Sequence, residues 1–227
     1  MKPIVTSCYP SVPVQDQLYL NSCAGHVCRE LAACLGVDVS AMWAYYIGRM
    51  ADGNQELEDN GVPLSTLLKA VNRRGVVSEK EWPFRAQMVS SHPPENVVGK
   101  KGQVEFFSIP AYSLKARLKA DQPVACVVEM SESFENFIVN PALDHQVFRG
   151  VPHDDVSEFG HAMVLTGYVP YLAGKQGAYM ARSSWGKGFG QCGTVYLPAS
   201  FIHDPTRVEQ FYVARRPSPL RGLEALV

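Results

Sequence analysis

The sequence predicts an α+β protein in which a helical first half packs against a strand-rich second half. Two observations predict this class. Apolar residues recur at helical spacing over residues 24–35, 41–50 and 66–74. From residue 104 onward, short runs rich in Val, Tyr and Phe replace them, bounded by Gly and Pro. Because the helices come first and the strands second, we expect two packed parts with a cleft between them.

The ends of the predicted helices follow from their flanking residues. Gly36 is expected to end the first helix, since glycine readily adopts the left-handed conformation found there. Ser40 carries a hydroxyl that caps the second helix, and Ser65 is expected to cap the third, which Gly75 then ends. The polar, acidic stretch 51–60 between the second and third helices is interpreted as a surface loop.

The Pro-rich, irregular stretch 81–102 is predicted to join the two halves. We therefore expect one domain over residues 1–214, with a helical part over about 14–102 and a strand-rich part over about 103–214, followed by a tail at 215–227. The strand-rich part contains predicted strands at 104–109, 123–130, 161–169, 179–184, 194–197 and 210–213, with a short helix at 113–120.

Composition excludes several classes of function. The chain has 227 residues, of which 46% are hydrophobic and 19% charged, as in a globular protein. A net charge of −1 provides no basic field for nucleic acid or for an anionic membrane. No apolar run approaches the ~20 residues of a membrane span, and the N-terminus lacks a signal-peptide core. We expect a cytoplasmic protein, or one exported without a classical signal peptide.

The cysteine pattern indicates reduced thiols. None of the six cysteines forms a C-x-x-C pair, and their spacing does not require disulfides. Cys28 and Cys34 lie within a helical apolar pattern and Cys126 within a predicted strand, so all three are expected to be buried.

No metal or cofactor site is predicted. The glycine-rich loop 186–190 lacks the strand–loop–helix context and the G-K-[ST] ending of a phosphate-binding loop. One polar cluster matches no standard ligand spacing and is interpreted as a loop: His145, His153, Asp154 and Asp155.

Cys23 has the sequence context of a nucleophile. The turn-prone pair Asn21-Ser22 places it at the start of a helix, where unpaired N–H groups and the helix dipole stabilise a thiolate. Gln17, six residues earlier, carries an amide that can donate to an oxyanion. His161, at the start of an apolar run, supplies a base. These residue types predict acyl transfer through a thiol.

Four blocks, in order along residues 14–213, resemble the papain family of cysteine peptidases, in particular its bacterial branch. The last of the four blocks, at residues 182–186, is followed by Gly190 and Gly193, which also match the family pattern. The separation of 138 positions between Cys23 and His161 falls inside the window of about 130–150 found in this family. The blocks are Asp16-Gln17 with Ser22-Cys23-Ala24, then Asn60 to Leu67 followed by Gly75 to Phe84, then Gly160-His161-Ala162, and lastly Arg182-Ser183-Ser184-Trp185-Gly186.

The resemblance implies a papain-like fold, with a helical half packed on a β-barrel-like half and the active-site cleft between them. It implies that Cys23 is the nucleophile and His161 its base. Gln17 would complete the oxyanion hole together with the backbone N–H of Cys23. Gly61 would present its backbone to the substrate, and Trp185 would shield the histidine from water.

The resemblance also implies a pocket for the residue that precedes the scissile one. Its four lining residues are apolar and none is acidic, so a hydrophobic side chain is expected there rather than Arg or Lys. They are Val62, Pro63, Val127 and Ala162.

The sequence departs from the family pattern at three points. Ser183 stands where the family has an Asn that orients the histidine, so Ser183 is expected to be a weaker third member of the site. A bridging water or a different residue are the alternatives. Leu20 replaces a cysteine of the secreted members, which favours a reduced setting. The third point is that no part of this sequence resembles the inhibitory propeptide of the family, so we expect either that specificity alone limits activity or that a leader lies outside these residues.

These observations predict a thiol endopeptidase that acts on a protein or peptide substrate, without cofactor, nucleic acid or membrane. Two alternatives remain open: deamidation or transglutamination at the same site, and a binding module with weakened catalysis. The mildly amphipathic segment 217–227 is expected either to pack on the domain surface, or to bind a partner or occlude the cleft.

Overall fold

The computed structural model describes the chain except for residues 1, 8–11, 133, 135–158, 173–174 and 219–227. Most of the predicted tail and the cluster His145, His153, Asp154 and Asp155 therefore lie outside the described residues. No helix in the part of the chain that is described has the length and apolar character needed to cross a membrane.

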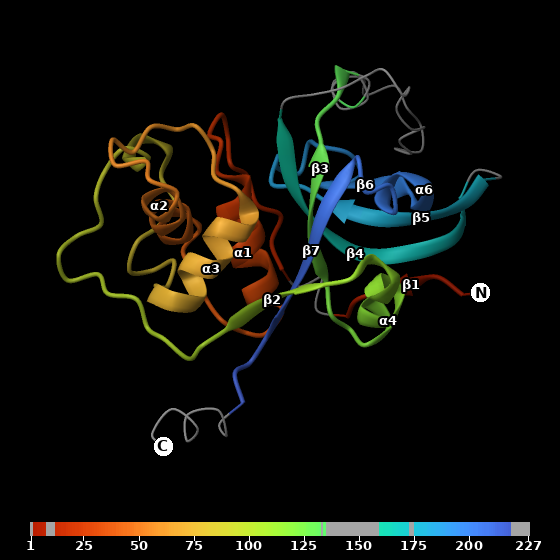
Figure 1. Ribbon diagram of the computed structural model, residues 1–227, viewed down its shortest axis with the longest axis horizontal. Coiled ribbons are helices and arrows are strands. Elements are labelled where there is room, and N and C mark those ends of the chain that lie inside the picture. The colour runs from red at the N-terminus through yellow and green to blue at the C-terminus, as the bar shows by residue number, and fades with distance from the viewer. Residues whose placement is uncertain (1, 8–11, 133, 135–158, 173–174, 219–227) are drawn as a thin grey trace.

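The expected α+β architecture is confirmed. Three helices form one half of the molecule and an antiparallel sheet forms the other (Figure 1). Helix α1 contacts both the other two helices and strands β3, β4 and β7, so it lies at the junction of the halves. The helices of the first half are α1 (Cys23–Ala33), α2 (Ala41–Ala51) and α3 (Leu64–Arg74).

The sheet has the order β2-β7-β3-β4-β5-β6, and β1 pairs with β4 outside this path. The described strands do not close on themselves, so the sheet is open and the term barrel-like describes it only loosely. The strands are β1 (Ile4–Val5), β2 (Glu105–Ile109), β3 (Val124–Glu129), β4 (Gly160–Leu172), β5 (Lys175–Arg182), β6 (Thr194–Pro198) and β7 (Val208–Arg215), with the short helices α4 (Leu114–Lys119) and α6 (Ala199–Ile202).

The helix ends follow the local rules with one exception. The hydroxyl of Ser40 accepts a hydrogen bond from the backbone N–H of Trp43 at 3.0 Å, which confirms it as the cap of α2. Gly75 follows α3 with φ of 84°, as expected of a helix-ending glycine. Helix α3 begins at Leu64, directly after Pro63, so the prediction that Ser65 is the cap was wrong. Proline fixes the φ that a helix start needs, and the helix begins two residues before the predicted start at residue 66.

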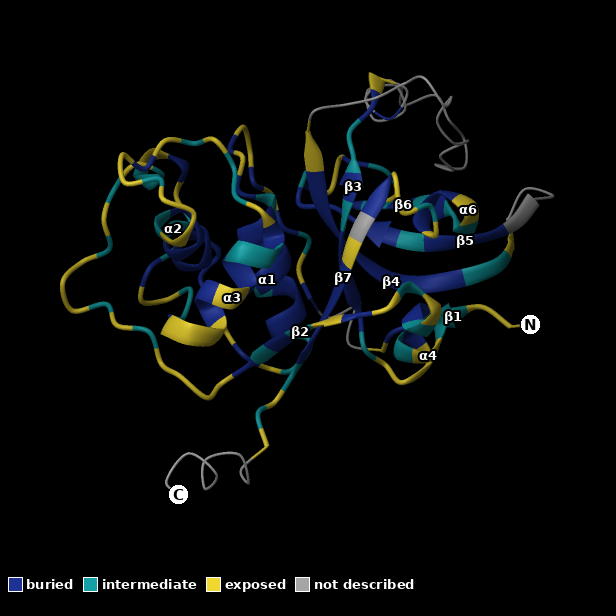
Figure 2. Ribbon diagram, viewed as in Figure 1, coloured by how far each residue is buried: buried dark blue, intermediate teal, exposed yellow. Residues whose placement is uncertain are grey.

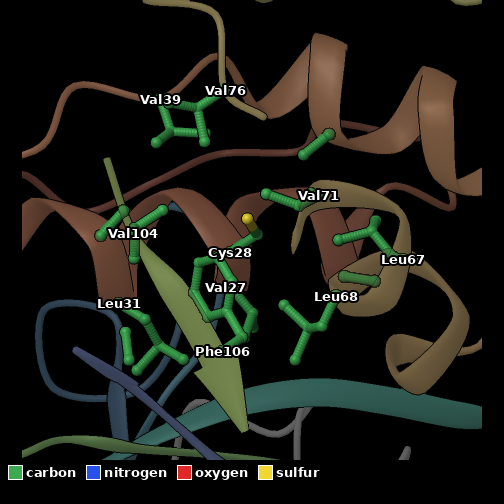
Figure 3. Packing of buried hydrophobic residues seen from close by; sticks show 14 of the residues in the cluster. Val27, Cys28, Leu31, Val39, Leu67, Leu68, Val71, Val76, Val104 and Phe106 are labelled. Atoms are coloured by element: carbon green, nitrogen blue, oxygen red, sulfur yellow. The ribbon is translucent and has the colours of Figure 1, made fainter. Parts of the chain in front are cut away.

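The core of the helical half forms where α1 meets α3 and β2. Val27, Cys28 and Leu31 of α1 pack with Leu67 of α3 and Phe106 of β2 (Figure 3). A second apolar cluster fills the sheet half, and the buried residues concentrate along α1 and the central strands (Figure 2).

Two of the three cysteines expected to be buried are so. Cys28 and Cys126 are fully buried, whereas Cys34, which follows the last residue of α1, is half-buried. No disulfide joins the cysteines that the structure describes, and Cys8 lies outside them.

His26 is a buried base without a hydrogen-bond partner. The side chain is 1% exposed, and neither ring nitrogen has a hydrogen bond. The ring packs edge-on against Phe84, with 4.5 Å between the ring centroids. Burial and, to a smaller extent, the positive charge of Arg29 together lower the pKa of His26 from 6.5 to about 3. The folded protein therefore holds this imidazole neutral.

The closest approach of α1 to α2 depends on a glycine, which leads to a first prediction. A Cβ atom at Gly25 would lie 2.5 Å from the carbonyl oxygen of Ala41 and 3.1 Å from Cβ of Tyr45. Gly25→Ala should therefore destabilise the fold by about 1–3 kcal/mol, because the backbone of α2 must move. The measurement is urea unfolding followed by circular dichroism. The control is Gly188→Ala, where no atom lies within 4 Å; equal stability of the two variants would contradict this packing argument.

A second prediction concerns the stability of the folded protein at low pH. His26 has a folded pKa of about 3, below that of an unfolded histidine, so the unfolded chain binds the additional proton. Stability is then fully present above about pH 6.5 and declines as the pH falls toward about 3, by up to about 1.4 kcal/mol per pH unit. His26→Phe and His26→Gln should both reduce this slope between pH 6 and 5, measured by urea unfolding at each pH. A slope unchanged in both variants would show that His26 does not titrate on unfolding.

Candidate active site

Cys23 is the first residue of α1, as the sequence predicts, and its side chain is half-buried at the wall of a cleft. Burial raises the pKa of the thiol above its usual value. The backbone N–H groups of Ala162 and Ala24 and of Cys23 itself act against this by stabilising the thiolate. Because Ala162 directly follows His161, the sulfur lies next to the chain segment that carries the imidazole.

His161 is the second residue of β4, and its orientation is fixed by two contacts. The ring nitrogen Nε2 lies 2.9 Å from the hydroxyl oxygen of Ser183, which follows the end of β5. The ring stacks on Trp185, with 3.8 Å between centroids and 16° between planes. Ser183 thus contacts the imidazole directly, without a bridging water.

Burial disfavours a charge on either partner alone. His161 is 4% exposed, and burial lowers its pKa from 6.5 to about 3, with a further contribution from the nearby His26. The thiol pKa moves in the opposite direction. Burial therefore favours the uncharged thiol and the uncharged imidazole.

Gln17 is held in place by hydrogen bonds to Ser184 and Leu20, and its carbonyl oxygen accepts from the backbone N–H of Leu20 at 3.2 Å. Its backbone N–H donates to the carbonyl oxygen of Ser184 at 2.7 Å, and its Oε1 accepts from the hydroxyl of Ser184 at 2.6 Å. Its Nε2 donates to the carbonyl oxygen of Leu20 at 2.5 Å. Leu20 thus accepts from one N–H of the Gln17 side-chain amide. Sequence reasoning placed Ser184 in a family block but missed its contact with Gln17.

The cleft between the halves has a volume of about 1380 Å³. Nearly all predicted site residues line it; Ser183 does not, because it lies behind His161. Val127 and Ala162 are direct partners in the pairing of β3 with β4, so these two pocket residues lie side by side. The predicted residues that line the cleft are Gln17, Cys23, Gly61, Val62, Pro63, Val127, His161, Ala162 and Trp185.

The cleft also contains residues that sequence reasoning missed. The stretch 51–60, interpreted as a surface loop, provides part of its wall, including Asp59. The Asp59 carboxylate accepts hydrogen bonds from the Tyr45 hydroxyl at 2.6 Å and from the Asn21 backbone at 3.1 Å. The same hydroxyl accepts from the backbone N–H of Gly61 at 3.2 Å. This network joins the loop to the turn before the nucleophile.

Two further cleft residues come from the other end of the chain. Gln210 and Tyr212 of β7 line the cleft, and the Tyr212 hydroxyl donates to the side-chain oxygen of Gln210. They add polar groups to the lining of the cleft that sequence reasoning did not identify. Over the described ranges, no group of three or more His, Cys, Asp or Glu side chains is arranged to hold a metal ion.

Comparison with known proteins agrees with this geometry. The structure is similar to xylellain, a cysteine protease from Xylella fastidiosa, with a TM-score of 0.79 and 20% identity over 96% of this chain and 87% of the other. It is also similar to the digestive procathepsin L 3 of Tenebrio molitor, with a TM-score of 0.68 and 15% identity over 94% of this chain and 69% of the other. No curated protein matches the chain by sequence. Residues 52–203, which include His161, match the model of the papain family of cysteine proteases. The chain therefore belongs to the papain family of cysteine proteases.

Proposed function

We propose that the protein hydrolyses peptide bonds through Cys23 and His161, with Gln17 in the oxyanion hole. The observation that carries the proposal is the shared cleft. The thiol at the start of α1, the imidazole oriented by Ser183 and Trp185, and the Gln17 amide held by Ser184 all face one space large enough for a peptide.

In the first half-reaction, the proton of the Cys23 thiol moves to Nδ1 of His161. The thiolate attacks the carbonyl carbon of the scissile bond, and the oxyanion accepts hydrogen bonds from the backbone N–H of Cys23 and from Nε2 of Gln17. The imidazolium then gives its proton to the leaving amine. The C–N bond breaks, and a thioester on Cys23 remains.

Water completes the second half-reaction. His161 takes a proton from a water molecule while the water oxygen attacks the carbonyl carbon of the thioester. The thiolate then leaves with the electrons of the C–S bond. The carboxylic acid product departs, and the proton on His161 returns to the sulfur. Trp185, stacked on the imidazole, keeps other water away from the ring during both steps.

The substrate side chain next to the scissile bond is proposed to be apolar, since Val62, Pro63, Val127 and Ala162 form that part of the cleft. Gly61 is proposed to present its backbone to the substrate. Its N–H is bonded to the Tyr45 hydroxyl, so a substrate must either compete with that bond or use the carbonyl of Gly61.

The third prediction tests the catalytic pair. Cys23 should react rapidly with iodoacetamide near neutral pH, because the imidazole accepts its proton, and His161→Ala should greatly slow this labelling. With an unstructured protein as substrate, the parent should generate new N-termini, read by mass spectrometry, and Cys23→Ala should generate none.

Two outcomes would contradict the proposal. A mass increase at glutamine without new termini would indicate deamidation on the same site. Slow labelling that does not depend on His161, together with no product, would indicate a binding module.

The fourth prediction concerns the residue that orients the base. Ser183→Ala removes the oxygen 2.9 Å from Nε2 of His161 and should lower kcat by about tenfold or more, because the ring is then free to rotate. Ser183→Asn supplies an amide oxygen in its place and should keep kcat near or above that of the parent. Steady-state kinetics on a peptide with an apolar residue before the scissile one measures both. Parent-like kcat in both variants would show that Ser183 does not orient His161.

A further inference from the structure

We infer that the buried ion pair between Glu30 and Arg182 positions the nucleophile helix relative to the base and the oxyanion donor. The inference rests on the proposed function of Cys23, His161 and Gln17. It gives a role in the reaction to two residues that touch neither the substrate nor the reacting atoms.

The ion pair crosses the junction between the two halves. Nε of Arg182, the last residue of β5, lies 3.0 Å from Oε1 of Glu30 on α1. The two side chains are 4% and 2% exposed. Nη2 of Arg182 also donates to the carbonyl oxygen of Val12 at 2.7 Å, in the segment that leads to Gln17. One guanidinium therefore binds α1 and the segment that precedes the oxyanion donor.

The position of Glu30 is coupled to that of Cys23, because both residues lie on α1, seven positions apart. Seven residues are about two turns, so the two residues lie on nearly the same face of α1. Because a helix moves as a rigid element, a displacement of Glu30 along or around the axis of α1 also displaces the sulfur of Cys23.

Arg182 is the first of four consecutive residues that each hold one part of the site. Ser183 contacts Nε2 of His161, Ser184 binds the side chain and backbone of Gln17, and Trp185 stacks on the imidazole. Fixing Arg182 to α1 fixes this segment to the helix of the nucleophile. The base, the oxyanion donor and the nucleophile are then held in fixed positions relative to one another.

The energetics favour a positioning role over a stabilising one. A buried ion pair loses much hydration energy, and replacing both partners with apolar residues of similar volume is often neutral or stabilising. Removing one partner, in contrast, leaves a buried charge and is strongly destabilising. What an apolar pair lacks is the attraction between the two buried charges and the hydrogen bond that Arg182 donates to the carbonyl oxygen of Val12. Burial lowers the pKa of Arg182 to about 10, so the guanidinium stays charged at neutral pH.

The test replaces both charges together, as Glu30→Leu with Arg182→Met in one chain. The thermal unfolding midpoint should stay close to that of the parent, while kcat and the rate of Cys23 alkylation by iodoacetamide near neutral pH fall by about tenfold or more. KM should stay within about twofold, because Val62 and Pro63 lie on a loop that the ion pair does not touch. The pH profile of alkylation should shift to higher pH, since His161 then accepts the proton less well.

A second variant keeps the test informative if the double replacement does not fold. Glu30→Gln preserves the volume and one accepting oxygen, and the folded fraction of this variant should show the same loss in kcat and in alkylation. The matched control is Glu129→Leu with Arg207→Met. That pair is also largely buried, with 2.7 Å between Arg207 Nη1 and Glu129 Oε2, but it joins parts of the sheet half alone. The control should retain parent kinetics.

Parent rates of alkylation and turnover in the double variant, or in Glu30→Gln, would overturn the inference. An equal loss in the Glu129 and Arg207 control would also overturn it, because the effect would then be general to buried charges. If the parent itself shows no His161-dependent alkylation, the proposed function fails instead.

Discussion

The position of α1 against the sheet is the constraint on which the cleft depends. The helix carries the sulfur at its first residue, while the imidazole lies on β4 and the groups that hold it follow β5. No local sequence rule brings these elements together. The apolar packing of α1 against β3, β4 and β7 brings them near, and the polar contacts made by residues 182–185 set their relative placement.

Three backbone N–H groups, those of Cys23, Ala24 and Ala162, stabilise the thiolate form of the Cys23 thiol, which is buried. The same enclosure that excludes water raises the pKa of Cys23 and lowers that of His161, and so opposes the charged pair. Fixed dipoles must then replace the missing hydration. The start of a helix and the backbone of β4 supply such dipoles without an additional side chain.

The features predicted correctly from sequence are those determined by near neighbours. The long amphipathic helices, the hydroxyl cap at Ser40 and the placement of Cys23 at a helix start all follow from a few adjacent residues. The features that were missed depend on distant pairing. Strand β1 has only two residues and forms because Ile4 and Val5 pair with β4. Whether a sheet closes into a barrel depends on how all its strands pair, so no single strand of the sequence predicts that this sheet is open. At Ser65, a general cap preference was overridden by Pro63, which lies two residues earlier and directly before the helix.

The candidate site divides in the same way. Cys23, His161 and Gln17 were identifiable by residue type and by four blocks in order. The contacts that hold them were not, because Ser184 and Gln17 lie 167 positions apart, and Gln210 and Tyr212 reach the cleft only through the pairing of β7 with β3. The acidic stretch 51–60 has the composition of any exposed loop, and only the packing of the halves makes it a wall.

The path of the chain has a mechanical consequence. It begins on the sheet side with β1, crosses to the helices, returns through β2, and after β7 places Arg216 on the carbonyl oxygen of Leu35, just after α1. Asn72 of α3 additionally bonds both backbone groups of Phe106 in β2. These contacts join the two halves at several levels. Under the proposed function, a protein substrate would have to offer an extended segment to a cleft whose walls are tied together in this way.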